Sequence, residues 1–254
     1  MTDYLRTPFQ GVWNIVRFNW HFYVAAAGGA LALVLAGLVW PPLRAYTPLL
    51  LLALLVPVAG SLAVSAYVYD CSDLYRLTWL QAPVPTNARL LTVNAGFDEI
   101  SAPLQDKYAP CQVQAVDFYD PARHTEVSIK RARRAYPPFP GTRPVDTRAP
   151  LPLPDNSIDL GFAFLAAHEI RNTDERAAFF QELRRVLKPA GRVVVTEHLR
   201  DTANFLAYTV GFFHFHSRRA WLATFRQAGF HLEQEIKITP FVTTFLLSKN
   251  GTAA

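Results

Sequence analysis

Two pairs of ionisable side chains in the second half of the sequence could do chemistry, and each pair follows an apolar stretch. His168 and Glu169 follow residues 157–165 (SIDLGFAFL), and Glu197 and His198 end residues 191–198 (GRVVVTEH). An imidazole or a carboxylate can transfer a proton near neutral pH when its surroundings adjust its pKa. We take His168 and Glu197 as catalytic candidates and His198 as a candidate substrate contact.

A second pair of histidines, His214 and His216, lies in the aromatic segment FFHFH. His214 is a further candidate substrate contact, although such a segment could equally face a membrane. Metal sites also use closely spaced histidines, but no carboxylate or third ligand accompanies this pair in the sequence. Cys71 and Cys111 are far apart and lack metal-ligand spacing, so we expect neither a metal site nor a disulfide framework.

After Cys71 the sequence alternates between apolar strands and amphipathic helices. Strands are expected at 89–94, 112–117, 157–165, 191–197, 231–238 and 242–247, and helices at 121–135, 173–187 and 216–228. This alternation predicts an α/β fold with a doubly wound, mostly parallel, Rossmann-like sheet. Ligands of such sheets bind at the carboxyl ends of the strands, so we expect the candidate residues to gather at that edge.

The first 70 residues have a different composition. Residues 22–40 and 47–69 contain no charged side chain, and each run is long enough to cross a bilayer as a helix. A signal peptide fits poorly because two runs follow one another, and uncharged runs of this length are uncommon in the core of a small domain. The sequence therefore predicts an interfacial segment (1–21), a transmembrane hairpin (22–69), a linker (70–88) and an α/β domain (89–249).

The basic residues around the hairpin indicate its orientation. Arg6 and Arg17 precede the first run, whereas the turn between the runs carries only Arg44. The positive-inside tendency thus favours both termini, and with them the α/β domain, on the cytoplasmic side. The basic run at 129–135 (IKRARRA) predicts a solvated helix face or a contact with anionic lipid headgroups. We do not expect it to bind nucleic acid.

Residues 151–199 resemble the central and late motifs of class I S-adenosylmethionine-dependent methyltransferases, in particular the ubiquinone and menaquinone C-methyltransferases. The segments that carry the resemblance are LPLPDNSID, RRVLKPAGRVVV and, further on, HFHSRRAWLATFRQAGF, and the likeness extends over residues 89–249. It implies S-adenosylmethionine as cofactor. The implied cofactor-binding residues are Asn94, Ala95, Gly96, Asp117, Phe118, Asp146 and Thr147.

The resemblance assigns roles to some of these residues. In the family a carboxylate at the end of the second strand binds the ribose hydroxyls; Asp117 occupies that place, and Asp120 is the alternative. Asp146 corresponds to the residue that meets the adenine amino group, although its spacing is one residue longer than usual. The loop in LLTVNAGFDEIS (90–101) departs from the family pattern, since only Gly96 remains of its glycines. Asn94 tolerates a positive φ, and Asp98 can cap the next helix.

Together these features predict a membrane-anchored methyltransferase that acts on a lipophilic small molecule such as a quinone, a polyprenyl compound or a lipid precursor, with membrane lipids around it. The altered loop leaves open a methyltransferase-like scaffold that has lost catalysis. A nicotinamide-dependent oxidoreductase ranks lower because no G-x-G-x-x-G follows any expected strand.

Overall fold

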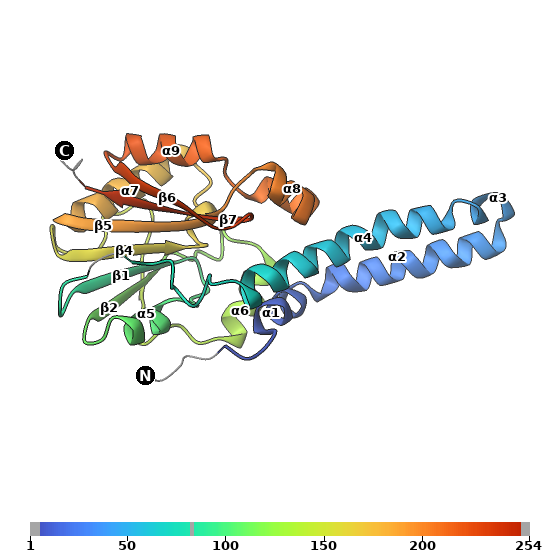
Figure 1. Ribbon diagram of the computed structural model, residues 1–254, viewed down its shortest axis with the longest axis horizontal. Coiled ribbons are helices and arrows are strands. Elements are labelled where there is room, and N and C mark those ends of the chain that lie inside the picture. Colours follow the sequence, from blue (N-terminus) through green and yellow to red (C-terminus); the bar gives the residue numbers. More distant parts are fainter. Residues whose placement is uncertain (1–5, 82–83, 250–254) are drawn as a thin grey trace.

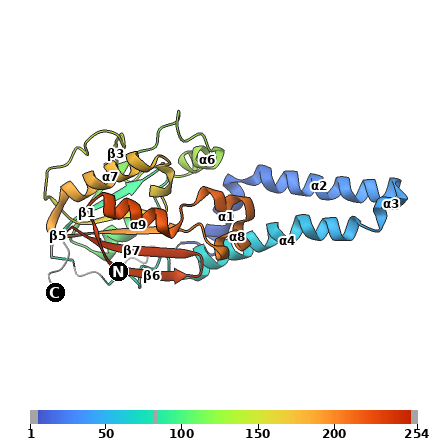
Figure 2. The same ribbon diagram turned by 90° about the horizontal axis from the view of Figure 1, so that it is seen from above.

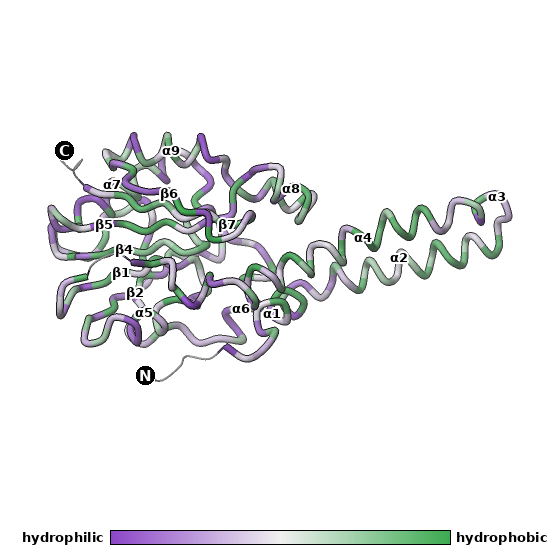
Figure 3. The backbone as a smooth tube through the Cα atoms, in the orientation of Figure 1, coloured by the Kyte–Doolittle hydropathy of each residue, from purple (hydrophilic) through white to green (hydrophobic). Residues whose placement is uncertain are grey.

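The computed structural model describes residues 6–81 and 84–249. An α/β domain and a pair of long antiparallel helices make up the chain, and the helices project from one end of the domain (Figure 1). The first five residues of the predicted interfacial segment lie outside the described part. Figure 3 shows that the projecting helices are apolar along most of their length.

A seven-stranded sheet forms the centre of the domain, in the order β3-β2-β1-β4-β5-β7-β6. The strands β1 to β5 are parallel, and β7 runs antiparallel to both of its neighbours. This confirms the predicted doubly wound, mostly parallel fold. The strands are β1 (Arg89–Asn94), β2 (Gln112–Asp117), β3 (Arg143–Pro144), β4 (Ile158–Phe164), β5 (Leu187–His198), β6 (His231–Thr239) and β7 (Val242–Ser248).

Helices cover both faces of the sheet. One face packs on aromatic residues of α7 (Thr173–Val186) and α9 (Arg218–Gln227), such as Phe180 and Trp221. The other face packs on α5 (Ser101–Lys107) and on Leu74, Leu77 and Leu80, which belong to the segment expected to be a linker. Part of the predicted linker is therefore core of the α/β domain.

Two predicted boundaries were wrong. The helix expected at 121–135 is α6 (Val127–Ala135), because the Asp120 amide donates to His124 Nδ1 (2.9 Å) and the Asp120 carboxylate accepts from the Ala122 amide, which holds the chain in a turn. Strand β5 begins at Leu187, because Leu187 already pairs with Ile158. Residues 188–191, between the expected helix at 173–187 and the expected strand at 191–197, form an irregularity in the register of β5 before pairing resumes between Leu160 and Arg192.

The N-terminal helices are α1 (Gln10–Phe18), α2 (Trp20–Val39), α3 (Pro41–Arg44) and α4 (Thr47–Ala66), and α4 continues as η1 (Tyr67–Cys71). Two segments, Trp20–Val39 and Thr47–Cys71, are long and apolar enough to cross a membrane. Only 6% of the most apolar stretch of each segment is buried, so neither segment is a core helix of the α/β domain. Their lengths match a bilayer core of roughly 30 Å.

Side-chain contacts fix the base of this hairpin to the domain. The Asp70 carboxylate, at the end of η1, accepts from the amides of Gly11 (2.6 Å) and Val12 (2.8 Å) in the first turn of α1. Tyr136, after α6, donates to Asn14 of α1 (2.9 Å). Helix α1 thus lies between the hairpin and the sheet, as Figures 1 and 2 show.

Candidate cofactor and substrate site

The loops after β1 and β2 are joined at the carboxyl edge of the sheet. The Gly96 amide donates to Asp117 Oδ1 (2.8 Å), and the Tyr119 amide donates to the same oxygen (2.9 Å). Gly96 has a φ of +94°, and a Cβ there would lie 2.9 Å from the Ile129 side chain. The remaining glycine of this loop is therefore required by its backbone conformation and by the close approach of α6.

Two adjoining cavities lie at this edge and share Asn94 and Phe97 in their walls. The first lies toward β2 and includes Asp98 and Asp117. The second lies toward β4 and has a volume of about 150 Å³. Its other walls are formed by Tyr75, Ala95, Glu99, Ile100, Ile129, Phe164, Leu165, Ala166 and Glu169.

Two buried polar atoms in these walls have no hydrogen-bond partner within residues 6–81 and 84–249. They are Asn94 Nδ2, a donor, and Asp98 Oδ2, an acceptor. Buried polar atoms are normally paired, so a donor and an acceptor of this kind fit a polar ligand. The other Asp98 oxygen accepts from the amides of Ile100 and Ser101 (3.0 Å each), which agrees with the predicted capping role.

Asp117 ends β2, where the resemblance expects the carboxylate that binds ribose, but its second oxygen is engaged. Oδ2 contacts the guanidinium of Arg133, which lies over the Tyr119 ring at 4.4 Å from its centroid. The Arg133 side chain is 37% exposed and can move toward solvent, which would free Oδ2 for a hydroxyl donor. Asp120, the alternative, is used within its own turn and lines neither cavity.

The other predicted cofactor residues lie away from both cavities. Asp146 is exposed and binds Arg148, whose hydrogen bonds lower the pKa of that carboxyl. Thr147 is buried and donates to Glu175. Phe118 is buried against Phe179 of α7. The structure therefore brings Asn94, Ala95, Gly96 and Asp117 together and leaves Phe118, Asp146 and Thr147 outside the cavity walls.

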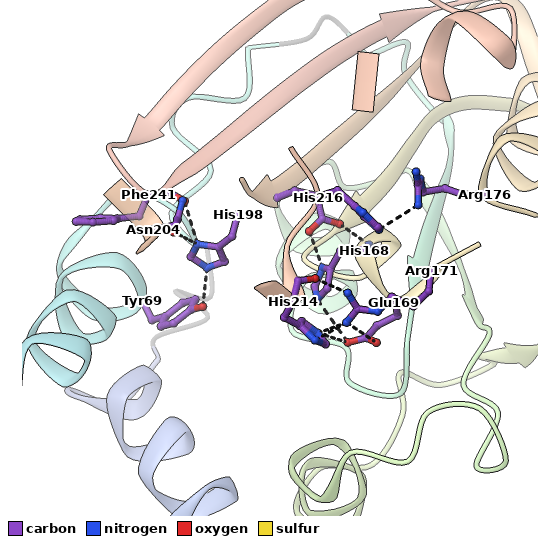
Figure 4. Close-up of polar contacts among 11 residues, drawn as sticks. Tyr69, His168, Glu169, Arg171, Arg176, His198, Asn204, His214, His216 and Phe241 are labelled. Atoms are coloured by element: carbon purple, nitrogen blue, oxygen red, sulfur yellow. Dashed lines mark hydrogen bonds and ion pairs between the residues drawn. The ribbon is translucent and has the colours of Figure 1, made fainter. Parts of the chain in front are cut away.

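The two catalytic candidates are in direct contact, and Figure 4 shows His168 beside Glu169 and His214. His168, in η2 (Ala167–Glu169) after β4, donates from Nδ1 to Glu197 Oε2 (2.6 Å), and its backbone amide donates to Oε1 (3.2 Å). Glu197 is fully buried near the end of β5. Parallel pairing of β4 with β5 brings these residues together although 29 positions separate them.

One imidazole and two carboxylates, those of His168, Glu169 and Glu197, determine the electrostatics here. Burial lowers the pKa of His168, but Glu197 and Glu169 outweigh it and raise the pKa to about 10. Burial raises the pKa of Glu169, and its bonds to His168 and His214 more than reverse that effect, so the carboxyl stays ionised. His168 and its two glutamates therefore form a buried ion-pair network at the wall of the second cavity.

His214 also belongs to this network. It ends η3 (Thr209–His214), and its Nε2 lies 3.0 Å from Glu169 Oε1, while its ring lies 5.1 Å from that of His168. The sequence showed no carboxylate and no third potential metal ligand beside His214. The structure brings both to it, since Glu169 is the carboxylate and His168 is the further ligand. They could not be found from spacing, because about 45 residues separate them along the chain.

His198 points away from this network. Its Nδ1 donates to the Phe241 carbonyl (2.9 Å), so its Nε2 accepts from the Tyr69 hydroxyl (2.8 Å) at the end of the hairpin (Figure 4). The pKa of His198 is lowered to about 4, mainly because the ring is buried, so the ring is neutral near pH 7. The structure places His198 at the joint between the hairpin and the domain, outside the walls of both cavities.

With this geometry in view, comparison with known proteins gives a consistent result. Residues 91–195 match the family model described as "Methyltransferase domain". The α/β part of this chain is a methyltransferase domain, and its cofactor is S-adenosylmethionine. No curated protein matches the sequence.

Solved structures agree with this domain in fold. One is a SAM-dependent methyltransferase from Aquifex aeolicus, with a TM-score of 0.53 at 16% identity over 76% of this chain and 98% of that chain. Another is a geranyl diphosphate C-methyltransferase from Streptomyces coelicolor, with a TM-score of 0.52 at 11% identity over 74% and 82%. A methyltransferase from Methanosarcina mazei gives 0.50 at 14% identity over 67% and 96%.

The methyltransferase domain has groups that fit its cofactor. The space between the β1 and β2 loops is lined by two unpartnered groups, Asn94 Nδ2 and Asp98 Oδ2. It is also lined by Asp117, whose ion-pair partner Arg133 is partly exposed. The cofactor supplies a methyl group on a positively charged sulfur. Asn94 Nδ2 as a donor, and Asp98 Oδ2 and the Asp117 carboxylate as acceptors, are the groups that would hold it in the first cavity.

Proposed function

We propose that this methyltransferase is anchored in a membrane by α2 and α4, and that it methylates a lipophilic small molecule such as a quinone, a polyprenyl compound or a lipid precursor. One observation carries the proposal. The segment that follows the second apolar helix contributes a wall of the second cavity through Tyr75. Tyr75 donates to Glu99 of the same wall (2.6 Å), and Arg6 binds the other Glu99 oxygen (2.9 Å).

An exposed apolar surface next to the hairpin supports a membrane location. Helix α8 (Thr202–Tyr208) lies beside α4, as Figure 2 shows, and η3 packs on α8. Their large apolar side chains are exposed by 48–80%, namely Phe205, Leu206, Val210 and Phe213. A patch of this kind continues the apolar surface of the hairpin, and exposed apolar patches commonly mark membrane or partner contacts.

Charge supports an orientation with the methyltransferase domain in the cytoplasm. Arg17 and Arg131 lie at the base of the hairpin, where Arg131 contacts the Phe18 carbonyl (2.6 Å) and the ring of Trp20. The turn at the other end of the hairpin carries only Arg44. Basic residues at the base would lie against the headgroups of the cytoplasmic leaflet.

We assign His168 and Glu197 the role of holding the methyl acceptor. Glu197 fixes the His168 ring through Nδ1, and this orients Nε2 toward Glu169, which lines the second cavity. Positioning supplies much of the rate of a displacement at a methyl group, because acceptor, methyl and sulfur must be aligned. In the Streptomyces structure a protein of this fold contains geranyl diphosphate, a prenyl compound.

The test uses the full-length protein in nanodiscs prepared from a bacterial lipid extract, with S-adenosylmethionine labelled in its methyl group. Label should pass into an organic-soluble product, and Glu197→Gln should reduce that transfer at least tenfold while cofactor binding persists. The proposal is contradicted if cofactor is bound but label never enters the organic phase. A protein that binds no cofactor would instead indicate the inactive scaffold that the altered β1 loop suggests.

A further inference from the structure

We propose that His168, Glu169 and His214 form a binding site for a divalent first-row transition-metal ion such as Zn²⁺, Mn²⁺ or Co²⁺. One ligand atom from each side chain lies within 4.8 Å of the other two. His168 is buried and the other two are half-buried, so the donors converge at a site screened from bulk water. The proposal concerns metal binding and does not depend on the proposed substrate.

The hydrogen bond between His168 and Glu197 is the arrangement that a ligating histidine normally has. A metal-bound imidazole usually donates its other N–H to a carboxylate, which fixes the ring and its tautomer. Here Nδ1 donates to Glu197 (2.6 Å), and Nε2 is directed at Glu169, 3.4 Å away. Glu197 is fully buried, so the ring is held in this orientation by a side chain that cannot itself reach solvent.

The donor set indicates the class of ion. Two imidazoles and one carboxylate suit zinc, iron, manganese, cobalt or nickel, whereas magnesium and calcium prefer sites made of oxygen atoms alone. Three protein ligands leave at least one coordination position open. Glu169 lines the second cavity, so that position would be accessible to an oxygen atom of a bound substrate.

Arg171 competes with a metal ion for this site. Its guanidinium lies 2.7 Å from His214 Nε2 and 3.7 Å from Glu169 (Figure 4). A metal ion would have to displace this positive charge and also the proton on Nε2 of His168, because only a neutral imidazole nitrogen can bind a metal, so binding releases one proton to solvent. The Arg171 side chain is 42% exposed and can turn toward solvent, so removing it should strengthen metal binding rather than weaken it.

The experiment titrates chelator-treated, full-length protein in detergent with Co²⁺ and Zn²⁺, followed by visible absorption and calorimetry. We expect one ion per chain. His214→Ala should lower the affinity at least tenfold, and Glu197→Gln should lower it about 10–100-fold, as expected for loss of the partner of a ligating histidine. Arg171→Ala should raise the affinity. His231→Ala, an exposed histidine of β6, is the control and should change nothing.

The Arg171→Ala variant protects the test against misfolding, since a damaged protein would not bind more tightly. The proposal is overturned if no ion binds, or if His214→Ala and Arg171→Ala bind as the parent does. In either case the cluster is an ion-pair network that holds η3 against η2.

Discussion

The joint between the hairpin and the methyltransferase domain should make the protein sensitive to acid through His198. The ring is buried and neutral, and both nitrogens are used, with Nδ1 donating to Phe241 and Nε2 accepting from Tyr69. Its pKa is lowered from 6.5 to about 4, first by burial. The unfolded chain therefore binds a proton at higher pH than the folded one, and stability falls as pH falls from 6.5 toward 4.

The size of this effect follows from the shift. A shift of the His198 pKa from 6.5 to about 4 lowers the free energy of unfolding by about 3 kcal/mol once the ring is protonated in both the folded and the unfolded protein. About 2 kcal/mol of this loss falls between pH 7 and pH 5. For a domain of this size such a loss lowers Tm by about 4–8 °C. Replacement of His198 by Gln removes the titrating group and should remove this part of the pH dependence.

Thermal unfolding by tryptophan fluorescence in detergent, at pH 7 and pH 5, provides the measurement. Other groups titrate in both proteins, so the difference between parent and His198→Gln isolates the contribution of His198. His231→Gln, on the exposed edge of β6, should keep the parent's pH dependence. If His198→Gln loses as much Tm between pH 7 and pH 5 as the parent does, the assignment of a buried neutral ring is refuted.

Three further changes test the packing. A Cβ at Gly11 would lie 2.4 Å from Tyr69 Cβ, so Gly11→Ala should destabilise the protein by about 1–3 kcal/mol in thermal unfolding, whereas Gly28→Ala, with open space, should have little effect. Asn172 accepts two amides at the start of α7, so Asn172→Ala should cost about 1 kcal/mol in the same assay. Arg176 is buried and donates to three groups, so Arg176→Ala should cost about 3 kcal/mol, and a Tm unchanged by it would contradict its structural role.

The sequence predicted the fold well because its signals are local. Strand β5 is rich in β-branched residues, α7 has apolar residues at helical spacing, and each apolar helix is an uncharged run. The boundaries that failed depend on contacts that spacing does not reveal. His124 holds the turn before α6. Leu74, Leu77 and Leu80 of the expected linker are buried against the face of the sheet that α5 covers.

The positions of the candidate site residues were predictable where these residues end a strand. Asn94, Asp117 and the pair His168–Glu197 all follow or end strands of one parallel sheet, so they share an edge. His198, expected to contact the substrate, lies outside both cavity walls because neighbouring positions of a strand point to opposite faces, and it faces Tyr69 instead. The contact of His214 with Glu169 depends on how α8 and η3 fold back, which no local pattern encodes.

The measurement that tests the central claim most directly is calorimetric binding of S-adenosylmethionine to the full-length protein in nanodiscs. We expect binding by the parent, loss of binding in Asp117→Ala, and binding at least as tight as the parent's in Arg133→Ala, because the ion pair on Asp117 is then absent. Asp106→Ala, an exposed carboxylate of α5, is the control. A folded parent that binds no cofactor, or an Asp117→Ala variant that binds as the parent does, would contradict the assignment of this cavity as the cofactor site.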